Sequence, residues 1–264
     1  MADFLIDTHA HIQVMPKAIQ AEVIERAKKA GVKKMVNVAC NLKEIPEGLR
    51  LVEKYDNVWT TAGIQPTDLT ENREKSLEQV FEYAKNGKKV VAIGEIGLDY
   101  YWDKFPCETQ KEFLRGQLEI ADDLSLPAIL HCRGGKKPGE NEQTYLDMIG
   151  ILEEMDFKNA VVHCFSGNAV EAEKLLDMGL MLSFTGIITY PQNTALRDVV
   201  RKTPLNRIMI ETDSPFLPPE GYRGQKNEPA FVAEVAKTIA EIKDVPLEEV
   251  ARMTSENAER FFRI

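Results

Sequence analysis

The sequence contains few cysteines and no long apolar run. Its 264 residues include four cysteines without CxxC spacing, which favours free thiols over a disulfide framework. No stretch approaches the roughly 20 apolar residues of a membrane-spanning helix. The N-terminus lacks the basic region, apolar segment and cleavage site of a signal peptide. We therefore expect a cytoplasmic protein that has no membrane partner.

Positive charge is also scarce, with 33 lysines and arginines against 42 acidic residues and a net charge of −9 at pH 7. A protein that coats nucleic acid through charge alone needs a positive surface, because it must neutralise phosphates. The composition argues against that class. It does not exclude a nuclease in which metal ions bind the phosphate locally.

Short apolar runs alternate with amphipathic segments, a pattern typical of βαβ units on a parallel sheet. Helical spacing of apolar residues is clearest at 17–31, 110–125, 168–179 and 230–243. The expected strands are 3–8, 34–39, 58–63, 90–95, 127–131, 160–164, 180–184 and 207–212. This order predicts an α/β fold, a (β/α)8 TIM barrel that forms a single domain over residues 1–264, and we expect a monomer. An open doubly wound sheet is the alternative.

Two segments are expected to be exposed loops. Residues 133–143 are polar and rich in glycine. Residues 214–229 are stiffened by proline and follow the last expected strand, so they should lie over the barrel mouth.

All four histidines, and two acids, lie in or at the ends of the apolar runs. TIM-barrel active sites are assembled at the carboxyl ends of several strands, and histidine and carboxylate side chains are frequent metal ligands. The pattern therefore predicts a metal centre, while core or surface histidines with ordinary partners are the alternative. The candidate ligands are His9, His11, Glu95, His131, His163 and Asp213.

One ion rarely needs six protein ligands, whereas two ions that share a bridging carboxylate would use them all. His9 and His11 are two apart on a strand, so both project to the same side. We expect these two histidines and Asp213 to bind the first ion. His131 and His163 would bind the second ion, with Glu95 as the bridge.

Asp213 has a second candidate role, because a carboxylate beside an activated water can act as general base. A solvated loop acid or a helix N-cap is the alternative for this residue. Asp7 and Asp99 are weaker candidates, and Asp7 could instead orient one of the histidines.

Several segments resemble the TatD family of metal-dependent deoxyribonucleases in the amidohydrolase superfamily. They read IDTHAHI, AIGEIGLDYY, LHCR, VHCFSG, IETDSPFL and YRGQKNEP, followed by NAERFF, and run from residue 6 to the chain end. The resemblance implies a TIM barrel with a divalent-metal centre. It also implies hydrolysis of phosphodiester bonds in DNA, as a 3′-to-5′ exonuclease that favours single strands. The family's metal ligands correspond to the same six residues.

One segment departs from the family pattern. The family usually carries GxHPH at the end of the third strand, where this chain has GIQPTD with Gln65 and Thr67. Glutamine can donate a hydrogen bond, but it cannot carry charge or transfer a proton near neutral pH. The departure predicts either weakened nuclease activity or a different substrate.

Gln65, Arg223, Lys226 and Tyr101 are the expected substrate contacts. The two cations could hold a phosphate, and Tyr101 could stack on a base, as could its neighbours Tyr100 and Trp102. Unpaired loop cations and a packed aromatic lid are the alternatives. Three further cations after the fifth strand have similar reach, namely Arg133, Lys136 and Lys137.

Two other functions fit the same ligands. A metal-dependent deacylase or amidohydrolase could act on a carboxylic ester or amide such as aminoacyl-tRNA, since activated hydroxide also attacks carbonyl carbon. No lysine stands at a predicted strand end to form a carbamylated bridge, which favours phosphodiesters. A non-catalytic metal-binding scaffold is the third possibility. Four imidazoles suit Zn²⁺, Fe or Ni²⁺ as the bound ion, oxygen-rich sites favour Mg²⁺ or Mn²⁺, and the resemblance implies Mg²⁺ for activity.

Overall fold

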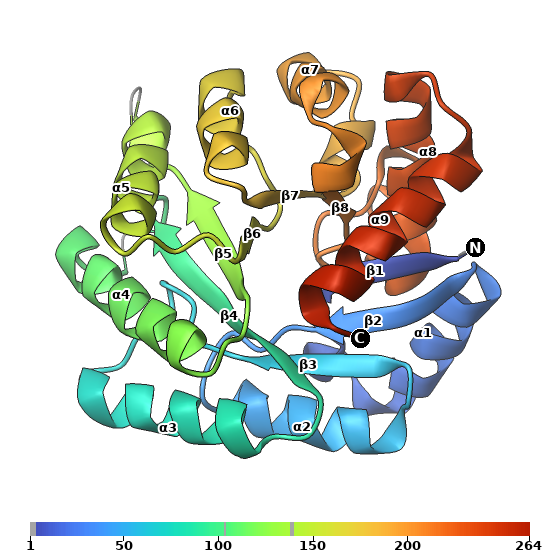
Figure 1. Cartoon of the computed structure of the whole chain (residues 1–264). Helices are drawn as coiled ribbons and strands as arrows, with labels where there is room; N and C mark the ends of the chain where they lie inside the picture. The colour runs from blue at the N-terminus through green and yellow to red at the C-terminus, as the bar shows by residue number, and fades with distance from the viewer. Residues whose placement is uncertain (1–3, 103, 138–139) are drawn as a thin grey trace.

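Eight parallel strands follow one another around a barrel in the order of the chain (Figure 1). The computed structural model describes residues 4–102, 104–137 and 140–264. The predicted TIM barrel is confirmed. The strands are β1 (Leu5–Ala10), β2 (Val32–Asn37), β3 (Val58–Ala62), β4 (Val90–Asp99), β5 (Ala128–Arg133), β6 (Ala160–Val162), β7 (Met181–Phe184) and β8 (Ile208–Ile210).

Polar contacts join the first and last strands and nearly close the barrel. The Asp7 carboxylate accepts hydrogen bonds from the backbone N–H and the hydroxyl of Thr212, at 2.9 and 2.6 Å. Ala10 forms an isolated parallel bridge with Ser214. Asp7 therefore ties β1 to the segment after β8. It does not orient a histidine ring, which was the role considered for it from the sequence.

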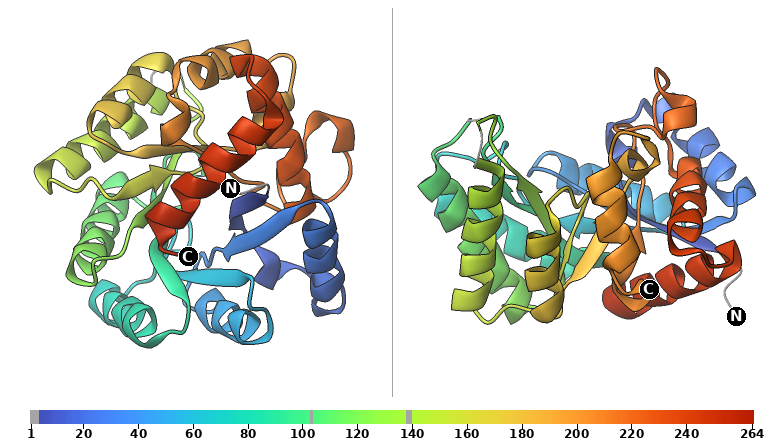
Figure 2. Two further views of the ribbon diagram at one scale, coloured as in Figure 1. Left: turned by 45° about the vertical axis from the view of Figure 1, so that its right-hand side comes forward. Right: turned by 90° about the horizontal axis from the view of Figure 1, so that it is seen from above.

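Helices surround the strands on the outside (Figures 1 and 2). Their apolar faces pack on the outward faces of the strands in one large cluster that includes Ile24, Phe113, Leu130 and Leu152. Four of them correspond to the helices that apolar spacing predicted. The helices are α1 (Lys17–Lys29), α2 (Glu44–Lys54), α3 (Arg73–Asn86), α4 (Cys107–Asp123), α5 (Glu140–Glu154), α6 (Ala169–Asp177), α7 (Thr194–Lys202) and α8 (Val232–Lys243).

The last helix, α9 (Leu247–Phe262), lies across one end of the barrel, as the left view of Figure 2 shows. Its Ala258 and Phe262 pack against apolar side chains of the strands, among them Ile6, Val36 and Met209. Most strand residues of this cluster lie near the starts of their strands, as Ile6, Val91 and Ile129 do, so α9 closes the amino-terminal end. The carboxyl ends of the strands remain free for a site.

β4 and β5 continue further than the sequence predicted, and their arrows are long in Figure 1. They pair as far as Asp99 and Arg133, whereas the apolar runs suggested ends at 95 and 131. The register shifts between Ile93 and Ile96, so Glu95 lies at an irregularity within β4 and not at its end. The prediction was wrong because the polar residues beyond the apolar run still pair with the neighbouring strand.

Gly97 makes this extension possible. Its φ is 144°, and a Cβ atom at this position would collide with the carbonyl oxygen of His131. Only glycine allows the backbone of β4 to pass so close to β5. The two strands therefore carry Glu95 and His131 side by side.

Both predicted loops contain some regular structure. Helix α5 begins at Glu140, inside the segment 133–143 that was expected to be a loop, and residues 138–139 lie outside the described residues. The segment 214–229 contains a short 3-10 turn at Glu220–Tyr222. Its Phe216 and Leu217 line a cavity at the barrel mouth, as expected for a segment that covers it.

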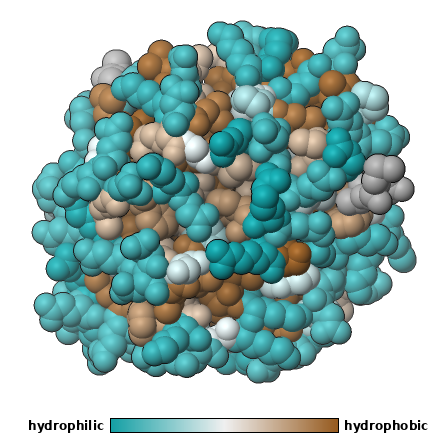
Figure 3. Space-filling view, in the orientation of Figure 1, coloured by the Kyte–Doolittle hydropathy of each residue, from teal (hydrophilic) through white to brown (hydrophobic). Residues whose placement is uncertain are grey.

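Hydrophilic side chains cover most of the face that Figure 3 shows, with apolar atoms visible between them. Among the described residues, no helix is long and apolar enough to span a bilayer. That the chain forms one domain and is monomeric stays a prediction.

Candidate metal centre

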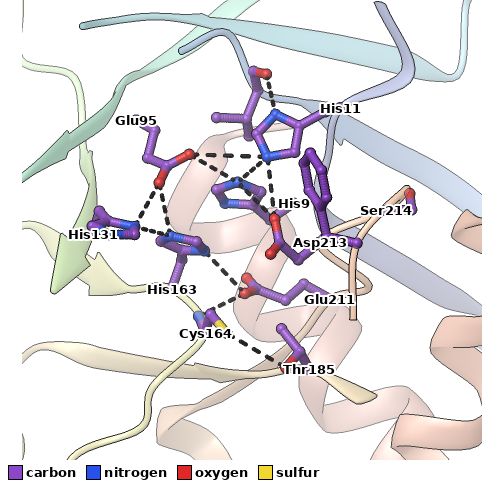
Figure 4. A network of polar contacts seen from close by, with 12 residues as sticks. His9, His11, Glu95, His131, His163, Cys164, Thr185, Glu211, Asp213 and Ser214 are labelled. Carbon is purple, nitrogen blue, oxygen red and sulfur yellow. Dashed lines mark hydrogen bonds and ion pairs between the residues drawn. The ribbon is translucent and has the colours of Figure 1, made fainter. Parts of the chain in front are cut away.

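The barrel brings all of the candidate ligands together at its carboxyl-terminal end (Figure 4). They come from five strands that are far apart in the sequence. His9 lies in β1, Glu95 in β4 and His131 in β5. The other three follow their strands within a few residues, and they are His11 after β1, His163 after β6 and Asp213 after β8.

Glu95 occupies the centre of the group, and its two oxygens face different pairs of histidines. Its Oε2 lies 3.5 Å from His9 Nε2 and 3.9 Å from His11 Nε2. Its Oε1 lies 2.8 Å from His131 Nδ1 and 3.1 Å from His163 Nε2. A carboxylate placed in this way can bridge two neighbouring cations.

Asp213 joins the pair formed by His9 and His11. Its Oδ1 lies 3.1 Å from His11 Nε2 and 3.8 Å from His9 Nε2. The residue has a positive φ of 56°, which is costly for a side chain other than glycine and is common at functional sites. Its N–H donates to the carbonyl of His9 at 2.9 Å, so this backbone conformation is held against β1.

Acceptors behind two of the rings orient them inward. His11 Nδ1 donates to the carbonyl of Val38 at 2.8 Å, so Nε2 faces the site. His131 Nε2 pairs with Asp99 Oδ2 at 3.1 Å, which leaves Nδ1 facing inward. Such partners are typical of histidines that bind metals.

Glu211 is a functional residue that the sequence reasoning missed. Its Oε1 lies 3.3 Å from His163 Nδ1, at ion-pair distance without hydrogen-bond geometry, and accepts from the N–H of Cys164 at 2.7 Å. The side chain is 1% exposed. The sequence did contain a sign of this residue, because Glu211 is an acid directly after the apolar run of β8 and two residues before Asp213.

Three carboxylates make the site favourable for positive charge. Burial lowers the pKa of His11, but the hydrogen bond and charge of Asp213 and the charge of Glu95 outweigh this and raise it to about 9. Burial also lowers the pKa of His163, but Glu95 and Glu211 outweigh it. The pKa of His163 therefore lies well above the usual value. Burial and the charge of His163 lower the pKa of His9.

A cavity of about 450 Å³ opens above this group. Large apolar side chains at its mouth are unusually exposed: Val14 by 45%, Trp102 by 55% and Phe216 by 54%. Exposed apolar surface around a polar centre is a mark of a ligand site. The sequence reasoning did not single out Val14 or Phe216.

The two residues that depart from the family pattern after the third strand, Gln65 and Thr67, both line this cavity. The Gln65 amide N–H donates to Asp68 Oδ2 at 3.2 Å, and Asn41 donates to the same oxygen at 2.9 Å. The amide oxygen of Gln65 accepts no hydrogen bond from any described residue.

The remaining expected substrate contacts lie elsewhere. Arg223 and Lys226 do not line the cavity, and Arg223 lies 3.5 Å from Glu220 and over the ring of Tyr190. Tyr101 lines a neighbouring cavity of about 510 Å³. Arg133 lines the cavity itself. The roles of all these residues stay predictions.

The chain matches a protein family described as TatD related DNase over residues 6–263. It belongs to this family. Within the TatD family it is 39% identical over 263 residues to the uncharacterized metal-dependent hydrolase YabD of Bacillus subtilis, with 98% of this chain and 99% of that protein covered. It is also 34% identical over 251 residues to the 3′-5′ ssDNA/RNA exonuclease TatD of Pectobacterium atrosepticum, with 92% and 93% covered.

Solved structures of the TatD family agree with this assignment. The crystal structure of YjjV, a TatD homolog from Escherichia coli K12, superposes with a TM-score of 0.92 at 33% identity, covering 100% of both chains. The fold, the family and these relatives show that the chain is a metal-dependent hydrolase.

The residues present fit a metal centre. Inward-facing imidazole nitrogens and carboxylate oxygens are a suitable donor set for divalent ions. Two groups of three lie within 4.8 Å of one another, His9 with His11 and Asp213, and His9 with Glu95 and His163. In addition, the buried Nδ1 of His9 has no hydrogen-bond partner among the described residues. Within that part of the chain, only Nε2 of this ring, which faces the site, makes polar contacts.

Proposed function

We propose that this chain hydrolyses phosphodiester bonds in single-stranded nucleic acid and removes nucleotides from the 3′ end. The observation that carries the proposal is the position of Glu95, whose oxygens are shared between two pairs of imidazoles beneath an aromatic cavity mouth. Two ions a few ångströms apart are the usual arrangement for in-line displacement at phosphorus.

Two divalent ions are the cofactors of this proposal. The first ion would be held by His9, His11 and Asp213, and the second by His131 and His163. Glu95 would contact both ions. When bound, such ions lower the pKa of a water molecule and offset negative charge on phosphate oxygens. We expect Mg²⁺ or Mn²⁺ to support activity, although four imidazoles also suit Zn²⁺, Fe or Ni²⁺.

Asp213 acts as the general base. Its Oδ1 is engaged by His11, while its Oδ2 makes no hydrogen bond to any described residue and is free to take a proton. Its side chain is 13% exposed, so it borders the cavity where a water molecule enters. The attacking water transfers its proton to this oxygen as its bond to phosphorus forms and the bond from phosphorus to the 3′-oxygen of the preceding nucleotide breaks. That 3′-oxygen leaves and takes up a proton from solvent.

Aromatic side chains at the mouth support a nucleic-acid substrate. Trp102 and Phe216 expose large ring surfaces, and every base offers a face for stacking. The named exonuclease among the relatives acts on single-stranded DNA and RNA, which agrees with this preference.

One observation favours a second candidate, the hydrolysis of a carboxylic ester such as that of aminoacyl-tRNA. The unoccupied acceptor at the mouth is the amide oxygen of Gln65, next to the carboxylates of Asp68 and Glu44. This side of the cavity suits a donor such as an amino group better than a phosphate. Release of the amino acid without nucleoside monophosphates would support this function.

The test uses a single-stranded oligonucleotide labelled at its 5′ end, with metal-stripped protein and added Mg²⁺, Mn²⁺ or Zn²⁺. We expect a ladder that shortens from the 3′ end and releases nucleoside 5′-monophosphates. In the Asp213→Asn variant the rate should fall by about 10²–10⁴-fold, the usual contribution of a general base. The exposed Asp198 on α7 offers a matched control, because Asp198→Asn removes the same charge far from the site.

An intact oligonucleotide under every metal would refute the nuclease proposal, and aminoacyl-tRNA would be the next substrate. Binding of the strand without cleavage of either substrate would support a scaffold instead. Undiminished cleavage by Asp213→Asn would refute only the general-base role of Asp213, and the proposed activity would stand.

A further inference from the structure

Cations and aromatic rings at the end of β5 and on the loops after β4 and β5 form a wall between two cavities. We call this wall the β4–β5 rim, and it consists of Tyr101, Trp102, Arg133 and Lys136. Trp102 and Arg133 line the cavity over the candidate metal ligands, of about 450 Å³. Tyr101 and Lys136 line the neighbouring cavity, of about 510 Å³. A chain-like ligand can therefore pass over the rim from one cavity to the other.

The rim is ordered by stacking. The Arg133 guanidinium carbon lies 4.0 Å from the ring centroid of Tyr101 and 5.6 Å from that of Trp102. Lys136 Nζ lies 4.7 Å from the Tyr101 centroid. Stacking fixes the plane of a guanidinium but leaves its N–H groups free at the edge, where a phosphate can accept them.

Asp99 connects the rim to the candidate ligands. Its Oδ1 accepts from the N–H groups of Tyr101 and Trp102 at 2.9 and 3.0 Å, and its Oδ2 pairs with His131. Arg133 follows His131 by two residues on β5, and its carbonyl accepts from Tyr100 N–H at 2.9 Å. The rim therefore has a defined position relative to the reaction centre.

Charge at the rim contrasts with the rest of this acidic protein. Neither Arg133 nor Lys136 forms an ion pair with a described residue, although the chain carries a net charge of −9. The adjacent Lys137 does, at 3.5 Å from Glu140. Of the described residues, the two acids that line the second cavity are already paired, Glu140 with Lys137 and Asp147 with Lys111 at 2.8 Å. Two cations are thus available to an anionic ligand beside two aromatic faces.

We propose that the β4–β5 rim binds the part of the strand that extends beyond the terminal nucleotide. Arg133 takes the phosphate that leaves the site cavity, Trp102 stacks on a base at the mouth, and Lys136 contacts the next phosphate in the second cavity. The inference rests on the proposed function, since it assigns the path of that same substrate.

This path differs from the one that the sequence suggested. Arg223 and Lys226 were the expected phosphate contacts, in the segment after β8. Arg223 also stacks on a tyrosine, at 5.0 Å from the Tyr190 centroid, but it lies near Glu220 and lines neither cavity. A comparison of Arg133→Gln with Arg223→Gln therefore distinguishes the two paths.

The experiment measures binding by fluorescence anisotropy, with a labelled ten-residue deoxythymidine strand whose 3′ linkages are phosphorothioates, in Mg²⁺ at several salt concentrations. Loss of charge-assisted hydrogen bonds in Arg133→Gln should weaken binding about 10-fold or more. The slope of log affinity against log salt should fall by about 0.7, the value for one phosphate of a single strand. Arg223→Gln should bind within about two-fold of the wild type, because it touches neither cavity.

Trp102→Leu tests stacking separately. Loss of one stacked base should weaken binding by about 5- to 150-fold, and the salt slope should stay unchanged because no charge is removed. Lys136→Gln is an exposed substitution that leaves the fold intact, and it should lower the salt slope like Arg133→Gln. Thermal unfolding of each variant shows whether it is folded.

Several results would overturn the inference. The first is that the wild type does not bind the strand. The second is an equal loss of affinity in Arg133→Gln and Arg223→Gln. The third is an unchanged salt slope in both Arg133→Gln and Lys136→Gln. The proposed function fails in a different way. If the wild type binds the strand through Arg133 but cleaves no unmodified oligonucleotide, the path stands and the nuclease activity does not.

Discussion

The two ends of the barrel both contain deeply buried side chains, but these are of opposite kinds. At the amino-terminal end, Ile6, Met209 and Phe262 are at most 3% exposed and contact other apolar groups. At the carboxyl-terminal end, His9 and Glu95 are also at most 3% exposed, yet both can carry charge. One barrel therefore contains a closed apolar end and a polar end of similar depth.

The difference shows where the stability of the fold originates. Burial of an apolar side chain contributes about 1.5–3 kcal/mol, whereas burial of a charge costs several kcal/mol unless a partner offsets it. The end beneath α9 stabilises the barrel, and the ligand cluster lowers that stability until positive charge is bound. Proteins often accept such a cost at sites that carry function.

The largest effect is expected when the central carboxylate is neutralised. Glu95→Gln removes the group that faces both pairs of histidines, so the protein should lose bound metal, and hydrolysis should fall by at least about 10²–10⁴-fold. Metal content by mass spectrometry and the rate of oligonucleotide cleavage check this. The metal-free variant should unfold at a lower temperature than the metal-free wild type, because His131 and His163 lose the buried charge that faces them.

Glu173→Gln offers the matched control for this change, because Glu173 is exposed on α6. A Glu95→Gln protein that keeps its full metal content and rate would break the distinction between the two ends of the barrel.

At the apolar end we expect a loss of stability without a loss of activity. Phe262→Ala should destabilise the fold by about 3–5 kcal/mol, because it leaves a cavity beneath the strands. The unfolding temperature should fall by roughly 6–20 °C, as measured by calorimetry. At 25 °C the rate per folded molecule should stay within about two-fold of the wild type. A lost rate without lost stability would contradict the separation of roles.

Metal removal tests the ligand cluster as a stabilising element. An ion present at 100 times its Kd adds about 2.7 kcal/mol of stability, since it binds the folded state alone. Stripping the protein with a chelator should therefore lower the unfolding temperature by roughly 5–10 °C. The shift should be much smaller in Glu95→Gln. An equal shift in both proteins would mean that the ions bind elsewhere.

The smallest effect is expected one contact away from the ligands. Glu211→Gln removes the charge facing His163 Nδ1 but can still accept a hydrogen bond from Cys164. Metal affinity should fall by about 10–100-fold, the usual effect of a partner behind a ligand. Isothermal titration with Mn²⁺ or Zn²⁺ measures this. Unchanged affinity would show that Glu211 serves only the backbone at Cys164.

Local patterns were sufficient to predict the strands, four of the helices and the six candidate ligands, but not Glu211. The apolar runs around His9, His131 and His163 indicated strands, and helical spacing indicated α1, α4, α6 and α8, because burial of one face repeats along the chain. The strand ends were less predictable. β4 continues past Glu95 because Gly97 allows close pairing with β5, and no apolar pattern marks that pairing.

The sequence by itself determined which side chains could serve as ligands, since the four histidines and a few acids near strands, chiefly Glu95 and Asp213, were candidates. Tertiary structure alone decided how they are arranged. The barrel aims Glu95 at both imidazole pairs, places Asp99 and Glu211 behind two of the rings, and stacks Arg133 on Tyr101. These contacts join residues from different strands, so their distances depend on how the sheet closes and not on spacing along the chain.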